Sequence, residues 1–448
     1  MHDSDEHVHL SITDLTPEAA WSTDLSSSDH EWLQSIASLE PEQFLLSEHL
    51  TQQPTETADV LEPILDRDLH GWRAGRYIGE IYHQGRTLRI RPRLGVDTIA
   101  QWLSAIHNVQ ILPDIAGRSQ GSRSLIIQLA AALWRAVVGK AGTHSLAREK
   151  VTRRSIGLQI KGTLDVASTS RLRATGHPEV VSTMTHRTLI TATNAAVVAA
   201  DRILNAYMGN PRWRGQRISE QLTTLRQAVG NNPRLPSKAQ LKRARYTPIT
   251  LKWRDAAELS RRIASNQLLN QNTQDASTYG VLIDVAELWE RFVLHCATEA
   301  TVENVTHGTR ATAGQHLLRS GVTLDAGMGR LYPDILIGAS ADHSGCRALI
   351  DAKYKPLTDP RGVDREDLYQ VHAYSMSFKP GRSLLAYPWV ADRSARAENL
   401  SPWISLAGSR LDFLRLPTNE GDCVEALRNW LHSTDVECCS RERDDLKS

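Results

Sequence analysis

The chain has 448 residues, 41% of them hydrophobic, a composition typical of globular proteins and a length that favours two or three domains over one core. No run of about 18 apolar residues occurs, and no basic segment followed by an apolar stretch opens the chain. These features argue against a membrane span and against secretion. The five cysteines show no C-x-x-C spacing, which argues against a disulfide framework or a structural zinc site. We therefore expect a cytoplasmic protein.

The net charge of +1 conceals a strong asymmetry along the chain. Residues 1–60 contain 13 acidic residues and no lysine or arginine, which leaves 52 basic and 38 acidic residues in the rest of the chain. The body of the protein is thus basic enough to approach a polyanion. We expect residues 1–60 to form an acidic, flexible arm.

The next segment, "GRYIGEIYHQGRTLRIRPRLG" (75–95), alternates apolar and polar residues around His83-Gln84-Gly85 and predicts a β-hairpin. One face of its second strand carries three arginines, which form either a solvated face or a contact surface for DNA or a partner protein. These are Arg89, Arg91 and Arg93.

Helices are predicted at 97–108, 122–139 (ending at Gly139) and 191–208, with a strand, turn and strand at 156–169. Residues 201–262 carry 14 basic and 4 acidic residues with interleaved aromatic residues, which favours contact with phosphates over a merely solvated helix surface. The candidate contacts are Lys242, Arg243 and Arg245. Residues 61–265 are thus expected to form a basic domain of a β-hairpin and helices.

A polar stretch at 266–280 predicts a domain boundary. After it we expect a helix at 281–300, strands through 355, a helix at 364–379, two further strands and a final helix, which together indicate an α/β domain over 281–435. A charged tail, 436–448, follows. The whole chain is therefore predicted to be an α+β multidomain protein.

Three charged residues lie beside two short apolar segments of this last domain, in "YPDILIGASADHSGCRALIDAKYK" (332–355). Residues i and i+2 of a strand point to the same side, so Asp351 and Lys353 should share a face. The polar segment 338–345 has the composition of a hairpin turn, and folding back there would bring Asp334 beside Asp351.

Two converging carboxylates repel each other unless a cation lies between them, and hard oxygen ligands suit Mg²⁺. A neighbouring lysine can position water or stabilise charge on a phosphate, so the set suits phosphodiester hydrolysis. The alternative is a turn aspartate and an edge-strand charge pair. The second apolar strand bearing Pro333-Asp334 and the helix that follows favour the catalytic interpretation.

This pattern resembles the PD-(D/E)xK nuclease superfamily, through Pro333-Asp334 and Asp351-Ala352-Lys353. Gln370 and Tyr374 match the Q-x-x-x-Y element of its RecB-like branch, where these residues orient the substrate or the surroundings of the metal. Relatives often add a glutamate from the preceding helix. Glu290 is the candidate for this position and a third metal ligand, with Glu287 second.

"IDAKYK" followed by "LYQVHAY", together with "IKGTLD", Thr193-Asn194 and "LRIRPRLG", is similar to the McrC family, the cleavage subunits of modification-dependent restriction systems. The resemblance implies an Mg²⁺-dependent DNA endonuclease, with Mn²⁺ as a substitute, acting in anti-phage defence on double-stranded, modified DNA. It also implies that the protein docks on an McrB-like AAA+ GTPase hexamer and stimulates it.

The chain has no G-x-x-x-x-G-K-[ST] motif, in keeping with a separate motor and with no nucleotide bound by this chain. Two alternatives remain open: a stand-alone repair or resolvase-type nuclease, and a catalytically silent adaptor that activates an ATPase.

Overall fold

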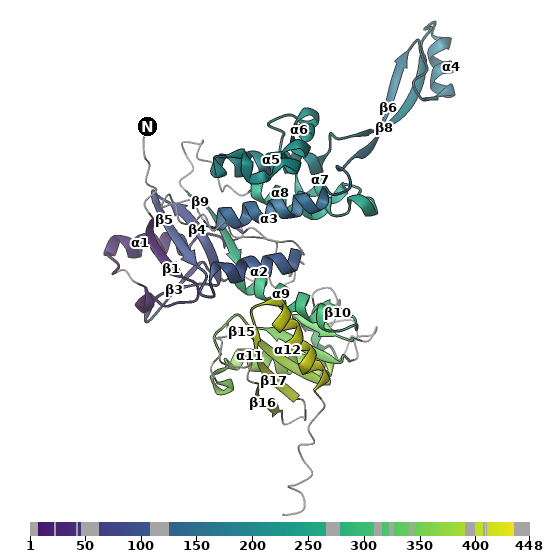
Figure 1. The fold of residues 1–448 in the computed structure, drawn as a ribbon. Helices are drawn as coiled ribbons and strands as arrows, with labels where there is room; N and C mark the ends of the chain where they lie inside the picture. Colours follow the sequence, from purple (N-terminus) through teal and green to yellow (C-terminus); the bar gives the residue numbers. More distant parts are fainter. Residues whose placement is uncertain are drawn as a thin grey trace, which may run out of the picture.

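The computed structural model describes residues 8–21, 24–41, 44–45, 62–107, 125–265, 278–308, 316–321, 327–339, 345–357, 359–389, 399–405, 408 and 410–433. It has an N-terminal β-rich part, a helical middle from which a narrow finger projects, and a C-terminal α/β part (Figure 1). The expectation of an α+β multidomain protein is confirmed. Among the described residues, no helix is both long and apolar enough to cross a membrane.

The N-terminal part is built on a four-stranded sheet in the order β1-β5-β4-β9. Its elements are β1 (Val8–Thr13), α1 (Ser27–Ala37), β4 (Tyr77–His83), β5 (Arg86–Arg91) and β9 (Thr278–Asp284), with β2 (Leu65–Asp68) and β3 (Gly71–Ala74) forming a separate hairpin. β4 and β5 are joined by Gln84 and Gly85, both with positive φ (52° and 79°), as a tight two-residue hairpin turn requires. At Gly79, a Cβ would lie 1.9 Å from the carbonyl oxygen of Val281, so only glycine fits where β4 meets β9.

The expectation of a flexible arm over residues 1–60 is wrong for most of its described residues. β1 pairs in parallel with β5, and α1 buries Trp32, Leu33 and Ile36 in the core of this part. The indole of Trp32 also donates a hydrogen bond to the carbonyl oxygen of His83, at 3.0 Å. The apolar residues spaced through this segment dock it in spite of its acidity. Residues 46–60 lie outside the described part.

The middle part is a group of helices that packs beside the N-terminal sheet (Figure 1). The helices are α2 (Val96–His107), α3 (Leu125–Ala141), α5 (Ala192–Met208), α6 (Gln216–Val229), α7 (Lys238–Arg243) and α8 (Trp253–Ser265). The helix predicted to end at Gly139 continues to Ala141, because one glycine costs a helix only about 1 kcal/mol.

The finger, residues 149–188, is a long antiparallel pair of strands that projects from this group (Figure 1). It comprises β6 (Glu149–Gly157), β7 (Thr163–Leu164), α4 (Val166–Ala174) and β8 (Val180–Thr188). The predicted strand, turn and strand at 156–169 is partly wrong, because a helix begins at Val166. Asp165 caps this helix by accepting a 3.0 Å hydrogen bond from the amide of Ser168.

The base of the finger is closed by Asn194, on α5. Its buried side-chain amide donates hydrogen bonds to the carbonyl oxygens of Ala147 (2.8 Å) and Leu189 (2.7 Å), which flank the two ends of the finger. Asn194, which is part of the resemblance to the McrC family, therefore has a structural role in this chain. It holds together the two backbone segments that enter and leave the finger.

The C-terminal part contains a six-stranded mixed sheet in the order β10-β13-β14-β15-β17-β16. Its elements are α9 (Val285–Ala300), β10 (Val305–His307), β13 (Ile335–Ile337), β14 (Ala348–Ala352), α11 (Arg365–Phe378), β15 (Arg382–Trp389), β16 (Asn399–Ile404), β17 (Arg410–Pro417) and α12 (Glu420–His432), with a separate hairpin of β11 (His316–Arg319) and β12 (Gly327–Arg330). The predicted helix at 281–300 is wrong in its first turn, since Val281–Asp284 extend β9. Asp284 then caps α9, so the chain passes directly from the N-terminal sheet into the C-terminal part.

Helices cover both faces of this sheet, and its strands are apolar on both sides, as expected for buried strands. Ile335 and Ile350 face the core that includes α9 and α12. Leu336 and Leu349 face the core formed with α11. Each such fully buried side chain contributes about 2 kcal/mol of hydrophobic stabilisation. The alternation assigns each residue of β14 to one face, and thereby fixes which way its polar residues point.

Candidate active site

The antiparallel pairing of β13 and β14 brings the two predicted aspartates together. Ile335 lies opposite Ile350, so Asp334, one residue earlier, lies beside Asp351 and Ala352. Asp334 is anchored there by its Oδ2 atom, which accepts a 2.6 Å hydrogen bond from the amide of Ala352. The expected fold-back between the two strands is confirmed by this register.

Asp351 and Lys353 share the face of β14 that looks toward α11, as the two-residue period predicts. The Nζ atom of Lys353 lies 2.8 Å from Oδ2 of Asp351, and Asp351 is 1% exposed. Tyr354 packs on the opposite face, in the core shared with α9. The backbone amide of Lys353 donates to the carbonyl oxygen of Ala386 at 2.8 Å, which extends the pairing with β15 up to the lysine.

Gln370 and Tyr374, on α11, contact this group. The Nζ atom of Lys353 donates to Oε1 of Gln370 at 2.8 Å, and Nε2 of Gln370 donates to the hydroxyl of Tyr374 at 2.9 Å. That hydroxyl donates in turn to the carbonyl oxygen of Tyr332, at 3.1 Å. This chain of hydrogen bonds fixes the orientation of the Gln370 amide, and so presents its oxygen to the lysine.

Glu290, on α9, bonds to the imidazole of His307, which is buried on β10. The negative charge of Glu290 also reaches the neighbouring Asp334, where it helps to raise the pKa of that aspartate. Glu287, the second candidate, forms an ion pair with Arg291, at 2.5 Å. Of the two glutamates, the structure therefore places Glu290 in the electrostatic surroundings of the aspartates.

The acidic groups of the site and Lys353 shift one another's pKa values. Burial, together with the charges of Glu290 and Asp351, raises the pKa of Asp334 well above its ordinary range. Burial would lower the pKa of Lys353, but the carboxylates of Asp351 and Asp334 outweigh it and raise that pKa.

The site has carboxylate oxygens suited to a divalent cation. The buried Oδ1 atom of Asp351 accepts no hydrogen bond from the described residues, and so retains its lone pairs. The described part of the chain holds no group of three or more histidine, cysteine or acidic side chains close enough to enclose a metal. Two carboxylates with open positions fit Mg²⁺, which usually keeps several waters and takes few protein ligands.

The predicted basic contacts are dispersed. Arg89 forms an ion pair with Glu80, at 2.5 Å, and Arg93 packs on Tyr354. Arg91 is exposed. The other three candidates are also exposed, on α7 or just after it: Lys242, Arg243 and Arg245. The arginine face of the hairpin is therefore largely engaged within the chain.

Two residues near the site were missed by sequence reasoning. Asp367 lies on α11 next to Lys353 and Lys355, and its signal was its position one helical turn before Gln370. His307, the partner of Glu290, has no such signal, because its position depends on the pairing of β10 with β13.

The fold and the site define a multidomain α+β protein whose C-terminal sheet presents two aspartates and a lysine to one helix. The chain belongs to the family described as McrBC 5-methylcytosine restriction system components, whose model matches residues 72–388. This confirms the family resemblance drawn from the sequence, and the matched range contains all three residues of the site.

Among solved structures, the chain is similar to one from a half-complex of a tetradecameric assembly of Thermococcus gammatolerans McrB AAA+ hexamers with bound McrC. The TM-score is 0.51 at 14% identity, over 82% of this chain and 84% of that chain. A structure of the Thermococcus gammatolerans McrBC complex matches with a TM-score of 0.43 at 13% identity, over 66% of this chain and 88% of that chain. No curated protein matches the chain.

Proposed function

We propose that this protein is the Mg²⁺-dependent DNA endonuclease subunit of an NTP-driven, modification-dependent restriction complex. The observation that carries the proposal is the convergence of Asp334, Asp351 and Lys353 at the ends of two paired strands in a chain of this family. The arrangement supports a PD-(D/E)xK nuclease domain over the C-terminal part.

In this mechanism Asp334 and Asp351 would hold the cation, with Glu290 close enough to influence Asp334. The bound cation would neutralise the phosphate and polarise its oxygen. Lys353 is the protein side chain that would assist the reaction directly. Its ammonium group, fixed by Asp351 and Gln370, can hydrogen-bond to the attacking water or to the phosphate, and stabilises the negative charge that develops as the phosphodiester breaks.

The docking role belongs, in this proposal, to the N-terminal and middle parts, and above all to the finger. Its 40 residues hold seven basic and three acidic residues. Several of its apolar side chains are exposed, including Ile156 (58%), Leu158 (76%) and Ile160 (57%). Apolar side chains so exposed on a projecting element are typical of a surface that a partner covers. The partner in this proposal is an AAA+ GTPase hexamer.

The catalytically silent adaptor is disfavoured by the site itself. A chain with no catalytic role has no need for two neighbouring buried aspartates, whose desolvation is costly without a compensating cation. Asp351 is 1% exposed, and the pKa of Asp334 is raised by burial and by its acidic neighbours.

Reconstitution with the candidate motor tests the proposal. The protein, its AAA+ partner, nucleotide and Mg²⁺ are mixed with DNA that carries or lacks modified cytosine, and Asp351→Ala is compared with wild type. Wild type should cleave only when metal and partner are present, and the variant should not cleave. Equal cleavage by both proteins, or none by wild type under any condition, would contradict the proposal.

A further inference from the structure

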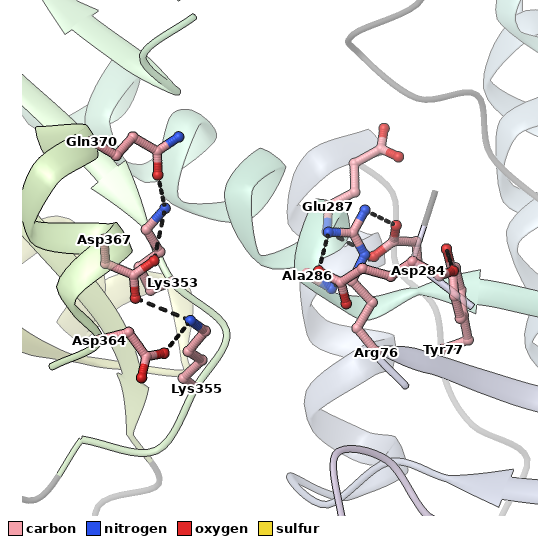
Figure 2. A network of polar contacts seen from close by, with 11 residues as sticks. Arg76, Tyr77, Asp284, Ala286, Glu287, Lys353, Lys355, Asp364, Asp367 and Gln370 are labelled. Atoms are coloured by element: carbon pink, nitrogen blue, oxygen red, sulfur yellow. Dashed lines mark hydrogen bonds and ion pairs between the residues drawn. The ribbon is translucent and has the colours of Figure 1, made fainter. Parts of the chain in front are cut away.

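Asp367, on the first turn of α11, lies between the ammonium groups of two lysines (Figure 2). Its Oδ1 atom is 3.7 Å from Nζ of Lys353, and its Oδ2 atom is 3.1 Å from Nζ of Lys355. Asp367 is 8% exposed. A carboxylate in so closed a position needs positive partners, and these two lysines provide them.

An ammonium group has three N–H donors, and the Nζ atom of Lys353 has three oxygen-bearing neighbours. Asp351 and Gln370 each lie 2.8 Å away, and Asp367 lies 3.7 Å away. In the proposed function Asp351 shares its charge with a cation. Asp367, which is not a ligand of that cation, then keeps its Oδ1 atom directed to Lys353.

The spacing of three polar residues along α11 supports a shared role in positioning Lys353. Asp367, Gln370 and Tyr374 follow one another at intervals of three and four residues, so all three lie on the face that looks toward β14. The helix thus presents a carboxylate, an amide and a phenol in one row, and the first two approach the same ammonium group.

A second acidic residue in the same network offers a matched comparison. Asp364, which directly precedes α11, forms an ion pair with Lys355 at 2.6 Å, and its side chain is 61% exposed (Figure 2). Asp364 contacts Lys355, whereas Asp367 lies near both Lys353 and Lys355. The two aspartates, three residues apart, thus share Lys355 as a partner but differ in burial and in whether they lie near Lys353.

We propose that Asp367 is a positioning residue, which holds the ammonium group of Lys353 in line with the scissile phosphate. This inference rests on the proposed nuclease function. Without the carboxylate, the lysine keeps its charge and its contact with Asp351 but is free to rotate away from Gln370. A misplacement of about 1 Å in a catalytic group can cost a factor of about 100 in rate.

Single-turnover cleavage of modified DNA by the complete complex tests the proposal with three variants: Asp367→Asn, Asp367→Glu and Asp364→Asn. We expect Asp367→Asn to lower the single-turnover rate constant at saturating complex by about 10- to 100-fold, with the half-saturating concentration of the complex changed less than about 2-fold. Asp367→Glu, which keeps a carboxylate, should restore most of the rate. Asp364→Asn should stay within about 2-fold of wild type.

A double variant separates positioning from folding. In a Lys353→Met background, Asp367→Asn should cause no further loss of residual cleavage, because the group that it positions is absent. A further loss in that background, a rate for Asp367→Asn equal to that of Asp364→Asn, or a failure of Asp367→Glu to recover activity would overturn the inference. If wild type itself does not cleave, the proposed function fails. If wild type cleaves and Asp367→Asn matches it, only the inference fails.

Discussion

The guanidinium of Arg93 lies 4.4 Å from the ring centroid of Tyr354, the residue that directly follows Lys353. The backbone amide of Arg93 also donates to Oδ1 of the buried Asp14, at 2.5 Å. Tyr354 packs edge-on against Trp102 as well, with ring centroids 6.3 Å apart. Residues of the N-terminal and middle parts therefore pack against Tyr354, on the side of the chain opposite the candidate catalytic lysine.

Replacing Arg93 should destabilise this junction. Burial raises the pKa of Asp14, and the arginine opposes that shift, so Arg93→Met leaves a buried carboxylate without its charge partner. We expect a loss of about 3 kcal/mol in the free energy of unfolding, measured in urea. Asp14→Asn combined with Arg93→Met should lose less than the two single variants added together. Strict additivity would show that the two residues do not interact.

Exposed apolar residues of the finger should matter for docking and not for stability. Ile156→Ser and Leu158→Ser remove side chains that are 58% and 76% exposed, so the melting temperature should change by no more than about 2 °C. Binding to the AAA+ partner, and the stimulation of its nucleotide hydrolysis, should fall at least about 10-fold. Unchanged binding by both variants would remove the finger from the docking surface.

Asn194 should be required to hold the base of the finger closed. Asn194→Ala leaves the carbonyl oxygens of Ala147 and Leu189 without their buried donor, which should cost about 2–3 kcal/mol. Hydrogen exchange followed by mass spectrometry should show faster exchange at the start of β6 and the end of β8. Thr152→Ala, at an exposed cross-strand pair within the finger, is the control and should leave exchange at the base unchanged.

The environment of His107 should make the free energy of unfolding fall at acidic pH. Burial, with help from the charges of Arg291 and Lys140, lowers its pKa to about 4. A histidine with a depressed pKa in the folded state takes up its proton on unfolding, so its contribution to stability is present above about pH 6.5 and declines as the pH falls toward 4. At pH 5 we expect wild type to have lost about 1–2 kcal/mol relative to pH 7. His107→Gln should flatten this part of the profile, and an unchanged profile would contradict the assignment.

The parts of the fold that the sequence predicted well are those whose signal is local. Strand alternation placed Asp351 and Lys353 on one face and Tyr354 on the other, and the four-residue spacing placed Gln370 and Tyr374 on one side of their helix. Both depend only on the geometry of a single element.

The wrong predictions concern features that depend on distant partners. The acidic N-terminal segment was expected to be a flexible arm, yet β1 pairs with β5, about 78 residues later in the chain. Val281–Asp284 form a strand because β4 pairs with them, although the stretch from 281 onward is also compatible with a helix. Asp367 was missed because its role depends on the packing of α11 against β14.

In the proposed function, Asp334, Asp351 and Lys353 perform cleavage and not docking. The most direct measurement follows single-turnover DNA cleavage and nucleotide hydrolysis in the same reactions of the complete complex, with wild type and Asp334→Asn. We expect the variant to lose cleavage by at least about 1,000-fold while stimulation of the partner's nucleotide hydrolysis stays within about 2-fold. Cleavage that persists in Asp334→Asn would contradict the claim, as would a parallel loss of both activities.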